Sequence, residues 1–365
     1  MTFSGSIPNY DGEGLVNLIA ELEHRLTGVS QAPRLSPEIA ARIPETSTYV
    51  LVVFDGLGDA QLDHPAAADL RRSRVAGLDS PFPSTTTVAL STIATGLPAS
   101  QHGLIGYQLY LDDLDTVVNT IRWTTPWGDP VEYDTAALLP TPNLWERLSA
   151  AGAEPISVQP AHFHGSALSN ALYRGARFEP IHSIDESIEA AVQLASSASR
   201  LILVYLPHVD FAAHVGGQDT AEYVEALRTV SWAWETMAHQ MPPGATMLGT
   251  ADHGHIDFPD ARRVEVPKRL HDDRTLYGDV RVVFVKGDGA AMARELPATW
   301  IPIAEARHWW GPEPWHPDVE ARLPDGLLVA DDDYVILPKH SNGKLVGNHG
   351  GVHPAERRIP LLVAS

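Results

Sequence analysis

The sequence predicts an α/β protein whose mostly parallel, doubly wound sheet is flanked by helices. Three apolar runs read as strands that are buried on both faces: Thr48 to Phe54, Leu201 to Leu206 and Ala245 to Gly249. Segments with a helical pattern separate these runs, and this alternation is typical of α/β folds. Each run is also followed within a few residues by aspartate or histidine. Since such sheets bind ligands beyond the carboxyl ends of their strands, one site is expected there.

The elements follow one another in a regular order along the chain. The first strand, TYVLVVF, ends at Asp55-Gly56. The later strands are separated or followed by four helical candidates. These are residues Thr87 to Thr95, Thr141 to Ala151, Asp185 to Ala198 and Thr220 to Gln240.

Residues 260–340 have a different pattern, with short strand-like pieces at Val280 to Val285 and Tyr334 to Leu337 and a tryptophan- and proline-rich cluster at Trp309 to Pro317. We interpret them as an inserted cap subdomain, because the apolar run Ile359 to Ala364 returns after it. The core would then comprise residues 1–259 and 341–365.

Composition limits the possible functions. The 46 acidic and 26 basic residues give a formal net charge of −20, which argues against nonspecific binding to nucleic acid or to an anionic membrane. The chain has no cysteine, so disulfides, thiolate zinc sites and cysteine nucleophiles are excluded. No signal-peptide pattern and no apolar run of about 18 residues is visible. A cytoplasmic protein is therefore expected; the oligomeric state is not indicated.

Six side chains of metal-binding type lie in four separated patches. Asp210 and His214 are four residues apart, so they share a face if the segment is helical. The other candidates are Asp55, Asp252, His253 and His349. Taken singly, each patch also fits a capping aspartate or a surface histidine. Catalytic zinc prefers three protein ligands, and the six candidates divide into two such sets: Asp210, His214 and His349, and Asp55, Asp252 and His253.

A hydroxyl-rich segment, Ser84 to Thr87, precedes the first helical candidate. A hydroxyl at a helix N-terminus beside a metal ion can attack phosphorus, and the free N–H groups of the helix can bind phosphate oxygens. The alternative is an ordinary Ser/Thr helix cap. Together with the metal candidates, the segment indicates two-metal phosphoryl transfer. Two Zn²⁺ ions are expected because the ligands are rich in histidine, with Mn²⁺ as the alternative.

Five stretches of the sequence together resemble the alkaline phosphatase superfamily, and within it the nucleotide pyrophosphatase/phosphodiesterase branch. They are VVFDGLGD (52–59), FPSTTTVALSTIATGLPASQHGLIGY (82–107), YLPHVDFAAH (205–214), TADHGHID (250–257) and GNHGG (347–351). The resemblance implies an alkaline phosphatase-like fold and the two zinc sets given above. It also implies that Thr86 is the nucleophile and a metal ligand, with Thr85 and Thr87 as alternatives if the alignment slips by one residue.

The implied activity is a phosphodiesterase or nucleotide pyrophosphatase-like hydrolase of a small phosphate ester. An asparagine that the branch has three residues after the nucleophile is replaced here by Ala89. Three alternatives therefore remain: a phosphomonoesterase, a phosphonoacetate hydrolase-like enzyme, and a catalytically silent binding protein.

Several further residues are candidates for contacts around this site. Thr87, His162 and His353 are proposed to contact substrate. Histidines that could orient ligands are His208 and His255. Tryptophans that could stack on a base, but are as well explained as buried anchors, are Trp123, Trp127, Trp309 and Trp310.

Overall fold

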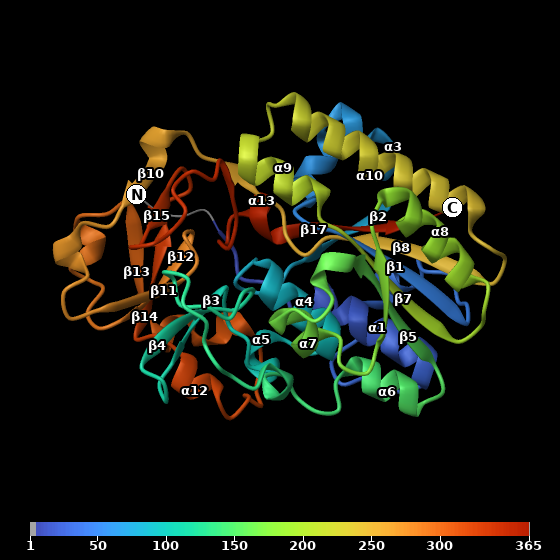
Figure 1. Cartoon of the computed structure of the whole chain (residues 1–365), viewed down its shortest axis with the longest axis horizontal. Coiled ribbons are helices and arrows are strands. Elements are labelled where there is room, and N and C mark those ends of the chain that lie inside the picture. The colour runs from blue at the N-terminus through green and yellow to red at the C-terminus, as the bar shows by residue number, and fades with distance from the viewer. Residues whose placement is uncertain (1–4, 365) are drawn as a thin grey trace.

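The computed structural model describes residues 5–364, and a seven-stranded sheet runs through its larger lobe, at the right of Figure 1. The strand order is β2-β17-β8-β1-β7-β5-β6. Strand β17 pairs antiparallel with β2 and β8, and the other strand pairs of this sheet are parallel. The mostly parallel sheet is therefore confirmed. The strand bounds are β1 (Thr48–Phe54), β2 (Arg74–Asp79), β5 (Glu154–Pro160), β6 (Arg177–Ile181), β7 (Arg200–Leu206), β8 (Ala245–Thr250) and β17 (Arg358–Val363).

The three strands expected from the sequence lie side by side at the centre of the sheet. All seven residues of β1 are buried, as expected for a strand covered on both faces. At its carboxyl end, Phe54 pairs with Leu206 of β7 and Val53 pairs with Thr250 of β8. This register brings the segments that follow the three strands to one edge of the sheet.

Helices cover both faces of the sheet (Figure 1). One face carries α1 (Leu15–Thr27), α4 (Thr86–Thr95), α6 (Leu144–Ala150) and α7 (Ala167–Leu172), and the other carries α3 (Ala68–Arg72), α8 (Ile184–Ala195), α9 (His208–Gly216) and α10 (Ala221–Gln240). The four expected helices are present as α4, α6, α8 and α10. Helix α6 begins later than expected because the Asn143 side chain accepts a hydrogen bond from the Glu146 N–H and caps it.

Residues 260–340 form most of a second, smaller lobe at the left of Figure 1. Its antiparallel sheet has the order β11-β12-β14-β13, and β10 pairs with β15. Phe284 of β12 and Trp310 pack edge to face, and Trp310 also packs against Phe82 of the larger lobe. The lobes therefore share apolar packing, and the division at residues 260 and 340 remains our proposal. The bounds are β10 (Arg263–Glu265), β11 (Thr275–Gly278), β12 (Val282–Lys286), β13 (Ala298–Pro302), β14 (Gly326–Ala330) and β15 (Val335–Leu337).

Short elements complete the chain. The strands are β3 (Gln108–Leu111), β4 (Thr116–Asn119), β9 (Ile256–Asp257) and β16 (Gly347–Asn348), and the helices are α2 (Pro37–Ala40), α5 (Ala99–His102), α11 (Ile303–Ala306), α12 (Val319–Arg322) and α13 (Pro354–Arg357). The β9–β16 pair is antiparallel and joins the segment after β8 to the segment that carries His349.

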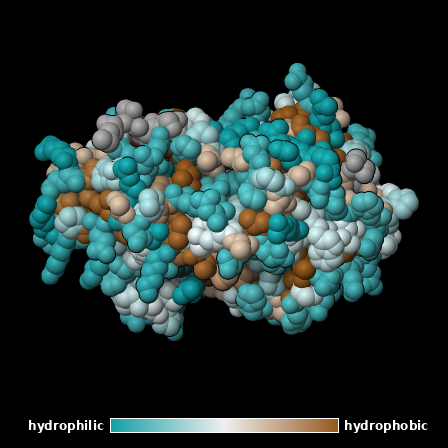
Figure 2. Space-filling model, turned by 90° about the horizontal axis from the view of Figure 1, so that it is seen from above, coloured by the Kyte–Doolittle hydropathy of each residue, from teal (hydrophilic) through white to brown (hydrophobic). Residues whose placement is uncertain are grey.

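The surface seen from above is mostly hydrophilic, with hydrophobic residues in separate spots (Figure 2). Among residues 5–364, no helix combines the length and the apolar character that a bilayer-spanning helix requires.

Candidate active site

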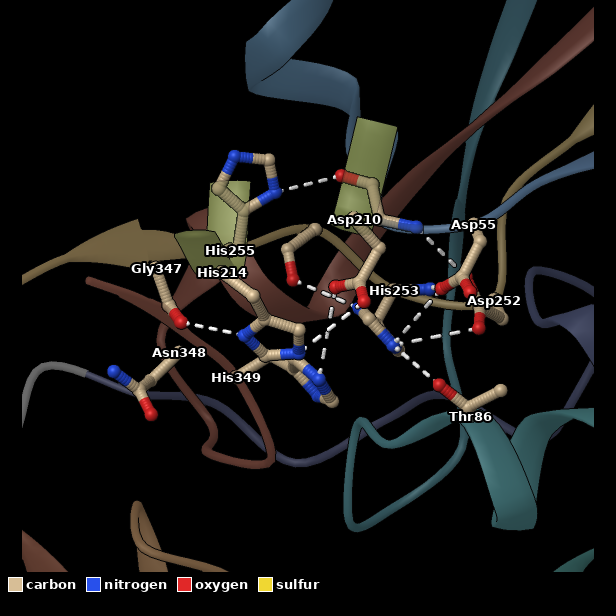
Figure 3. A network of polar contacts seen from close by, with 12 residues as sticks. Asp55, Thr86, Asp210, His214, Asp252, His253, His255, Gly347, Asn348 and His349 are labelled. Atoms are coloured by element: carbon tan, nitrogen blue, oxygen red, sulfur yellow. Dashed lines mark hydrogen bonds and ion pairs between the residues drawn. The ribbon is translucent and has the colours of Figure 1, made fainter. Parts of the chain in front are cut away.

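The candidate ligands converge at the carboxyl edge of the central sheet (Figure 3). Asp55 directly follows β1, and its backbone N–H donates to Leu206 O at the end of β7, 3.0 Å away. The Asp210 N–H donates to Asp55 O, also at 3.0 Å. Asp252 and His253 come after β8, whose end is level with that of β1. Strand register therefore explains why residues far apart in sequence meet here.

The first group of potential ligands is the expected one. Asp210 and His214 lie one turn apart on α9, with 3.2 Å between Asp210 Oδ2 and His214 Nε2. His349 Nε2 is 3.8 Å from Asp210 Oδ1. One potential ligand atom from each residue lies within 4.8 Å of the other two, a spacing compatible with one metal ion.

The second group differs in one member from the expected set. Asp55, Asp210 and His253 offer ligand atoms within 4.8 Å of one another, so Asp210 belongs to both groups. Asp252 lies beside this group, with its Oδ2 3.3 Å from His253 Nε2. The Asp252 Oδ1 accepts hydrogen bonds from the N–H groups of Gly56 and His253, at 3.1 and 3.0 Å.

All three histidines of the cluster are held through their Nδ1 atoms. The hydrogen-bond partners are backbone carbonyls: Gly347 O for His214 at 2.7 Å, Gly254 O for His253 at 3.0 Å, and Ser84 O for His349 at 3.1 Å. A carbonyl only accepts, so each Nδ1 carries a proton and Nε2 is the ring atom left to bind a metal ion. Nε2 of His253 faces the Thr86 hydroxyl at 3.0 Å, and Asp210, against the effect of burial, raises the pKa of His214 to about 9. A metal ion would therefore displace a hydrogen bond at His253 and a proton at His214.

Three buried carboxylate oxygens face this cluster without a hydrogen-bond partner in the described part of the chain. They are Asp55 Oδ1, Asp210 Oδ1 and Asp252 Oδ2. Buried acceptors are normally satisfied, and unpaired buried charge is costly. The donor set therefore fits cations: acceptor atoms and imidazole nitrogens converge, and no lysine or arginine forms an ion pair with these three carboxylates among residues 5–364.

The pKa shifts of the buried carboxyl groups and imidazoles also favour a bound cation. Burial, reinforced by Asp252 and Asp210, raises the pKa of Asp55 well above its usual range, and burial raises the pKa of Asp252 to about 6. Burial lowers the pKa of His253 to about 4 and also lowers that of His349. The two imidazoles are therefore neutral near pH 7, the form in which they bind metals, while Asp55 needs a nearby cation to ionise.

The Thr86 hydroxyl points at this cluster from the first residue of α4 (Figure 3). Its Oγ1 lies 3.0 Å from His253 Nε2. Thr87 is fully buried, and its Oγ1 is directed to Gly106 O, 3.4 Å away. Only Thr86 of residues 84–87 is not fully buried. The geometry thus favours Thr86 over its neighbours as the reactive hydroxyl.

Comparison with known proteins identifies the family of this chain. The model of the type I phosphodiesterase/nucleotide pyrophosphatase family matches residues 49–352. The chain belongs to this family. Its members are hydrolases of phosphodiester and pyrophosphate bonds and generally use divalent metal ions. The sequence comparison with curated proteins found no match.

Solved structures share the fold of this phosphodiesterase family member. Murine ectonucleotide pyrophosphatase/phosphodiesterase 5, in an inactive form with AMP, is 18% identical with a TM-score of 0.67; the match covers 86% of this chain and 87% of that chain. Phosphonoacetate hydrolase from Sinorhizobium meliloti 1021 with phosphonoformate is 18% identical with a TM-score of 0.65; the match covers 88% and 91%. The alkaline phosphatase-like fold is confirmed.

A cavity of about 1090 Å³ opens beside the metal-ligand cluster of this phosphodiesterase family member. Thr86, Asp210, His214 and His349 line it. It is large enough for a whole ester substrate. Residues from both lobes also line it, and those used below are Tyr107, Asn119, Arg122, His162, Tyr205, Phe211 and Asp279.

The expected substrate contacts are only partly placed at this cavity. His162 lines it. His353 does not, because its Nδ1 accepts a hydrogen bond from the Ala355 N–H, at 3.1 Å, and caps α13. Thr87 is turned into the protein interior, as described above. The expectation that His353 and Thr87 contact substrate is therefore not supported by the structure.

Three of the four tryptophan candidates, Trp123, Trp309 and Trp310, are buried anchors, whereas Trp127 is 58% exposed. Trp123 stacks on Tyr133, with ring centroids 5.0 Å apart, and Trp309 and Trp310 pack against Phe82. The Trp127 indole donates to Asp129 Oδ2 at 2.6 Å. None of these four tryptophans lines the cavity.

Two predictions about supporting residues have different outcomes. The His255 Nδ1 donates to Gly56 O, at 2.8 Å, and so supports the turn that follows Asp55. His208 begins α9 and does not line the cavity.

Ala89 is fully buried and also lies outside the cavity lining, so residue 89 is not a substrate contact in this chain.

Sequence reasoning missed two residues of the site. The Tyr205 hydroxyl donates to Asp55 Oδ2, and Asp279 of the smaller lobe lines the cavity and interacts with Thr85. Tyr205 lies within the quoted stretch YLPHVDFAAH as the second-last residue of β7, which is a usable signal. Asp279 has no comparable signal, because only the packing of the two lobes brings it to the cavity.

Proposed function

We propose that this protein is a metal-dependent phosphodiesterase that acts through Thr86 and two divalent metal ions. The observation that carries the proposal is the convergence of three carboxylate oxygens without hydrogen-bond partners, three imidazole Nε2 atoms and one hydroxyl in a cluster that opens on a single cavity. Residues Asp210, His214 and His349 would hold one ion. Asp55, Asp252 and His253, with Asp210 within reach and Thr86 completing the set, would hold the other.

Zinc is the proposed ion, with manganese as the alternative, because imidazole and carboxylate together suit zinc. When bound, such ions lower the pKa of a coordinated hydroxyl or water and neutralise charge that develops on oxygen. Three carboxylates contribute −3, so two divalent ions leave a local charge of about +1. A monoanionic diester would then be attracted in spite of the acidic surface.

Thr86 is proposed to attack the phosphorus atom in line with the leaving oxygen. The new Thr86 Oγ1–P bond forms as the P–O bond to the leaving group breaks. The Thr86 proton is released to solvent, and the leaving oxygen departs as an anion or takes a proton from solvent. Water then attacks the same phosphorus, so that the Oγ1–P bond breaks and Thr86 is regenerated. The first N–H groups of α4 are available to phosphate oxygens because they lack partners within the helix.

Tyr107 and Asn119, which also line the cavity, are proposed to bind phosphate oxygens. The Asn119 Nδ2 donates to the Tyr107 hydroxyl oxygen at 2.6 Å. The Tyr107 O–H hydrogen therefore remains available to an acceptor. Burial raises the pKa of Tyr107, so the phenol stays protonated and can donate at neutral pH.

A phosphonoacetate hydrolase-like activity is the second candidate, and one observation favours it. Of the described residues that line the cavity, Arg122 alone carries a permanent positive charge. A substrate with a carboxylate next to its phosphoryl group would match that charge. Activity on phosphonoacetate that is lost in the Arg122→Ala variant would favour this candidate over the diesterase.

The test of the proposed function is kcat/KM of zinc-loaded protein for bis(p-nitrophenyl) phosphate, with p-nitrophenyl phosphate as the monoester comparison. We expect a preference for the diester that is lost with a chelator and restored by zinc. Turnover that resists the chelator would refute the metal-dependent mechanism. Preference for the monoester would favour a phosphomonoesterase, and no turnover of either would favour a silent binding protein.

A further inference from the structure

A buried ion pair between Arg281 and Glu356 lies behind the two loops that carry His253 and His349. The Arg281 Nε donates to Glu356 Oε1 at 3.1 Å and Nη2 donates to Oε2 at 3.0 Å. The exposed fractions of the two side chains are 2% and 0%. Neither residue lines the cavity, so the pair does not contact substrate.

Glu356 holds both histidine loops from helix α13. Its Oε1 accepts a hydrogen bond from the Gly351 N–H at 3.0 Å, two residues after His349. Its backbone carbonyl accepts one from the Gly254 N–H at 2.7 Å, directly after His253. The Gly254 carbonyl in turn accepts from His253 Nδ1. One residue thus fixes a segment from each proposed metal site.

The loops touch α13 closely enough that only glycine fits. A Cβ on Gly351 would lie 2.8 Å from both carboxylate oxygens of Glu356. A Cβ on Gly254 would lie 2.2 Å from Ala355 O, which is shorter than any normal contact. The hydrogen bonds to Glu356 are therefore part of a tight backbone contact, so that a shift of Glu356 moves both loops.

Arg281 connects this contact to the smaller lobe. Its Nη1 donates to Asp331 O at 3.0 Å and also to Tyr334 O. Its guanidinium lies over the Phe258 ring, 4.9 Å from the centroid. All five N–H groups of an arginine point in fixed directions, so these contacts hold the Glu356 carboxylate in one orientation.

We propose that the Arg281–Glu356 ion pair positions His253 and His349 relative to each other and thereby sets the affinity of the site for its metal ions. The proposal rests on the proposed metal site. A buried ion pair adds little net stability compared with apolar residues, whereas groups that orient metal ligands typically change metal affinity by about 10- to 100-fold when they are removed. Arg281 and Glu356 are positioning residues in this account.

The experiment compares Glu356→Gln with a matched variant, Glu23→Gln. Glu23 is also fully buried, and its carboxylate pairs with Arg147 at 2.6 and 3.1 Å, but neither residue contacts the histidine loops. For each metal-free protein, zinc affinity is measured by competition with a chromophoric chelator, and the melting temperature is measured in parallel.

We expect both variants to melt at lower temperature, but only Glu356→Gln to lose zinc affinity, by about 10- to 100-fold. The zinc affinity of Glu23→Gln should stay within about threefold of the wild-type affinity, well below the loss expected for Glu356→Gln. Wild-type zinc affinity in Glu356→Gln would overturn the proposal. Equal losses in both variants would also overturn it, because general loosening would then explain the effect.

A second variant keeps the proposal testable if Glu356→Gln does not fold. Arg281→Lys retains the charge but not the two parallel hydrogen bonds, so an intermediate loss of zinc affinity is expected, and wild-type affinity would overturn the proposal. The proposed function is tested by the wild-type protein alone, which should bind zinc and hydrolyse the diester. If the wild type does neither, the proposed function is wrong, whatever the variants show.

Discussion

The Thr86 hydroxyl lies 3.0 Å from Nε2 of His253. Because His253 Nδ1 donates to Gly254 O, Nε2 is the acceptor and the threonine donates its proton. The proposed nucleophile therefore donates its hydrogen to the lone pair that His253 would offer to a metal ion. Zinc binding would replace this hydrogen bond by coordination and place the threonine oxygen next to positive charge.

Replacing Thr86 by alanine should lower kcat/KM for a diester by at least about 10³-fold, because the attacking oxygen is lost. Zinc affinity should change little, since histidine and aspartate side chains supply the other ligands. Steady-state kinetics and zinc titration of the same preparation check both parts.

The matched controls for this variant are Thr85→Ala and Thr87→Ala. Thr87 is buried with its hydroxyl directed to Gly106 O, and Thr85 is directed toward Asp279. Both variants should retain most turnover. If one of them is as inactive as Thr86→Ala and still folded, the nucleophile has been assigned to the wrong threonine.

Replacing Asp210 by asparagine should weaken both metal sites, because Asp210 offers an oxygen to each group of ligands. Asp252→Asn should weaken mainly the site that contains His253, its neighbour at 3.3 Å. Metal analysis after equilibration with limiting free zinc should therefore find less zinc in Asp210→Asn than in Asp252→Asn. Two tightly bound ions in Asp210→Asn would contradict the shared role.

Asp279 should make the stability of the metal-free protein depend on pH. Burial raises its pKa from 3.8 to about 7, so the folded state holds this proton more tightly than the unfolded state. That stabilisation is fully present below pH 3.8 and is lost as the pH rises through 7. Asp279→Asn has no such proton. The unfolding free energy of Asp279→Asn minus that of the wild type should therefore increase from pH 4 to pH 8, by up to about 4 kcal/mol, because only the wild type loses this stabilisation.

Urea unfolding of metal-free wild type and Asp279→Asn at both pH values measures this difference. The comparison cancels the other titrating groups of the site, which both proteins contain. A difference that is the same at both pH values would show that the Asp279 carboxyl is not held in its protonated form by burial.

Phe211 should favour substrates with an aromatic group. Its side chain is 70% exposed and lines the cavity, and Phe211 directly follows the proposed ligand Asp210. An aromatic contact contributes about 0.5–1.5 kcal/mol, so Phe211→Ala should lower kcat/KM for bis(p-nitrophenyl) phosphate about three- to tenfold more than for dimethyl phosphate. Val215→Ala is the control, because Val215 is 64% exposed on the same helix and does not line the cavity.

Much of this site was predictable because its residues are tied to strand ends or to short spacings. Asp55 follows a run that is apolar throughout, and Asp210 and His214 are one helical turn apart, so local patterns identify them. The sequence places Asp210 in one metal set, whereas in the structure it can offer a ligand atom to both groups. This shared position depends on the register of β1 against β7. The His353 imidazole caps α13 and does not line the cavity, a local role that the sequence pattern does not indicate.

Asp279 and the Arg281–Glu356 pair were not predictable from the sequence. Asp279 and Arg281 lie in the segment expected to be a cap, and their partners are far away along the chain: Thr85 for Asp279, and Glu356, 75 residues away, for Arg281. Nothing local distinguishes these charged residues from surface ones. Only the packing of the two lobes buries them next to the histidine loops.

The central claim, a covalent intermediate on Thr86 in a metal-dependent diesterase, is tested most directly by the stereochemistry at phosphorus. The zinc-loaded enzyme would hydrolyse a P-chiral phosphorothioate diester in oxygen-18 water, and the configuration of the product would be determined. Two successive in-line displacements each invert phosphorus, so this account predicts net retention. Net inversion would mean that water attacks the substrate directly and would contradict the role of Thr86 as nucleophile.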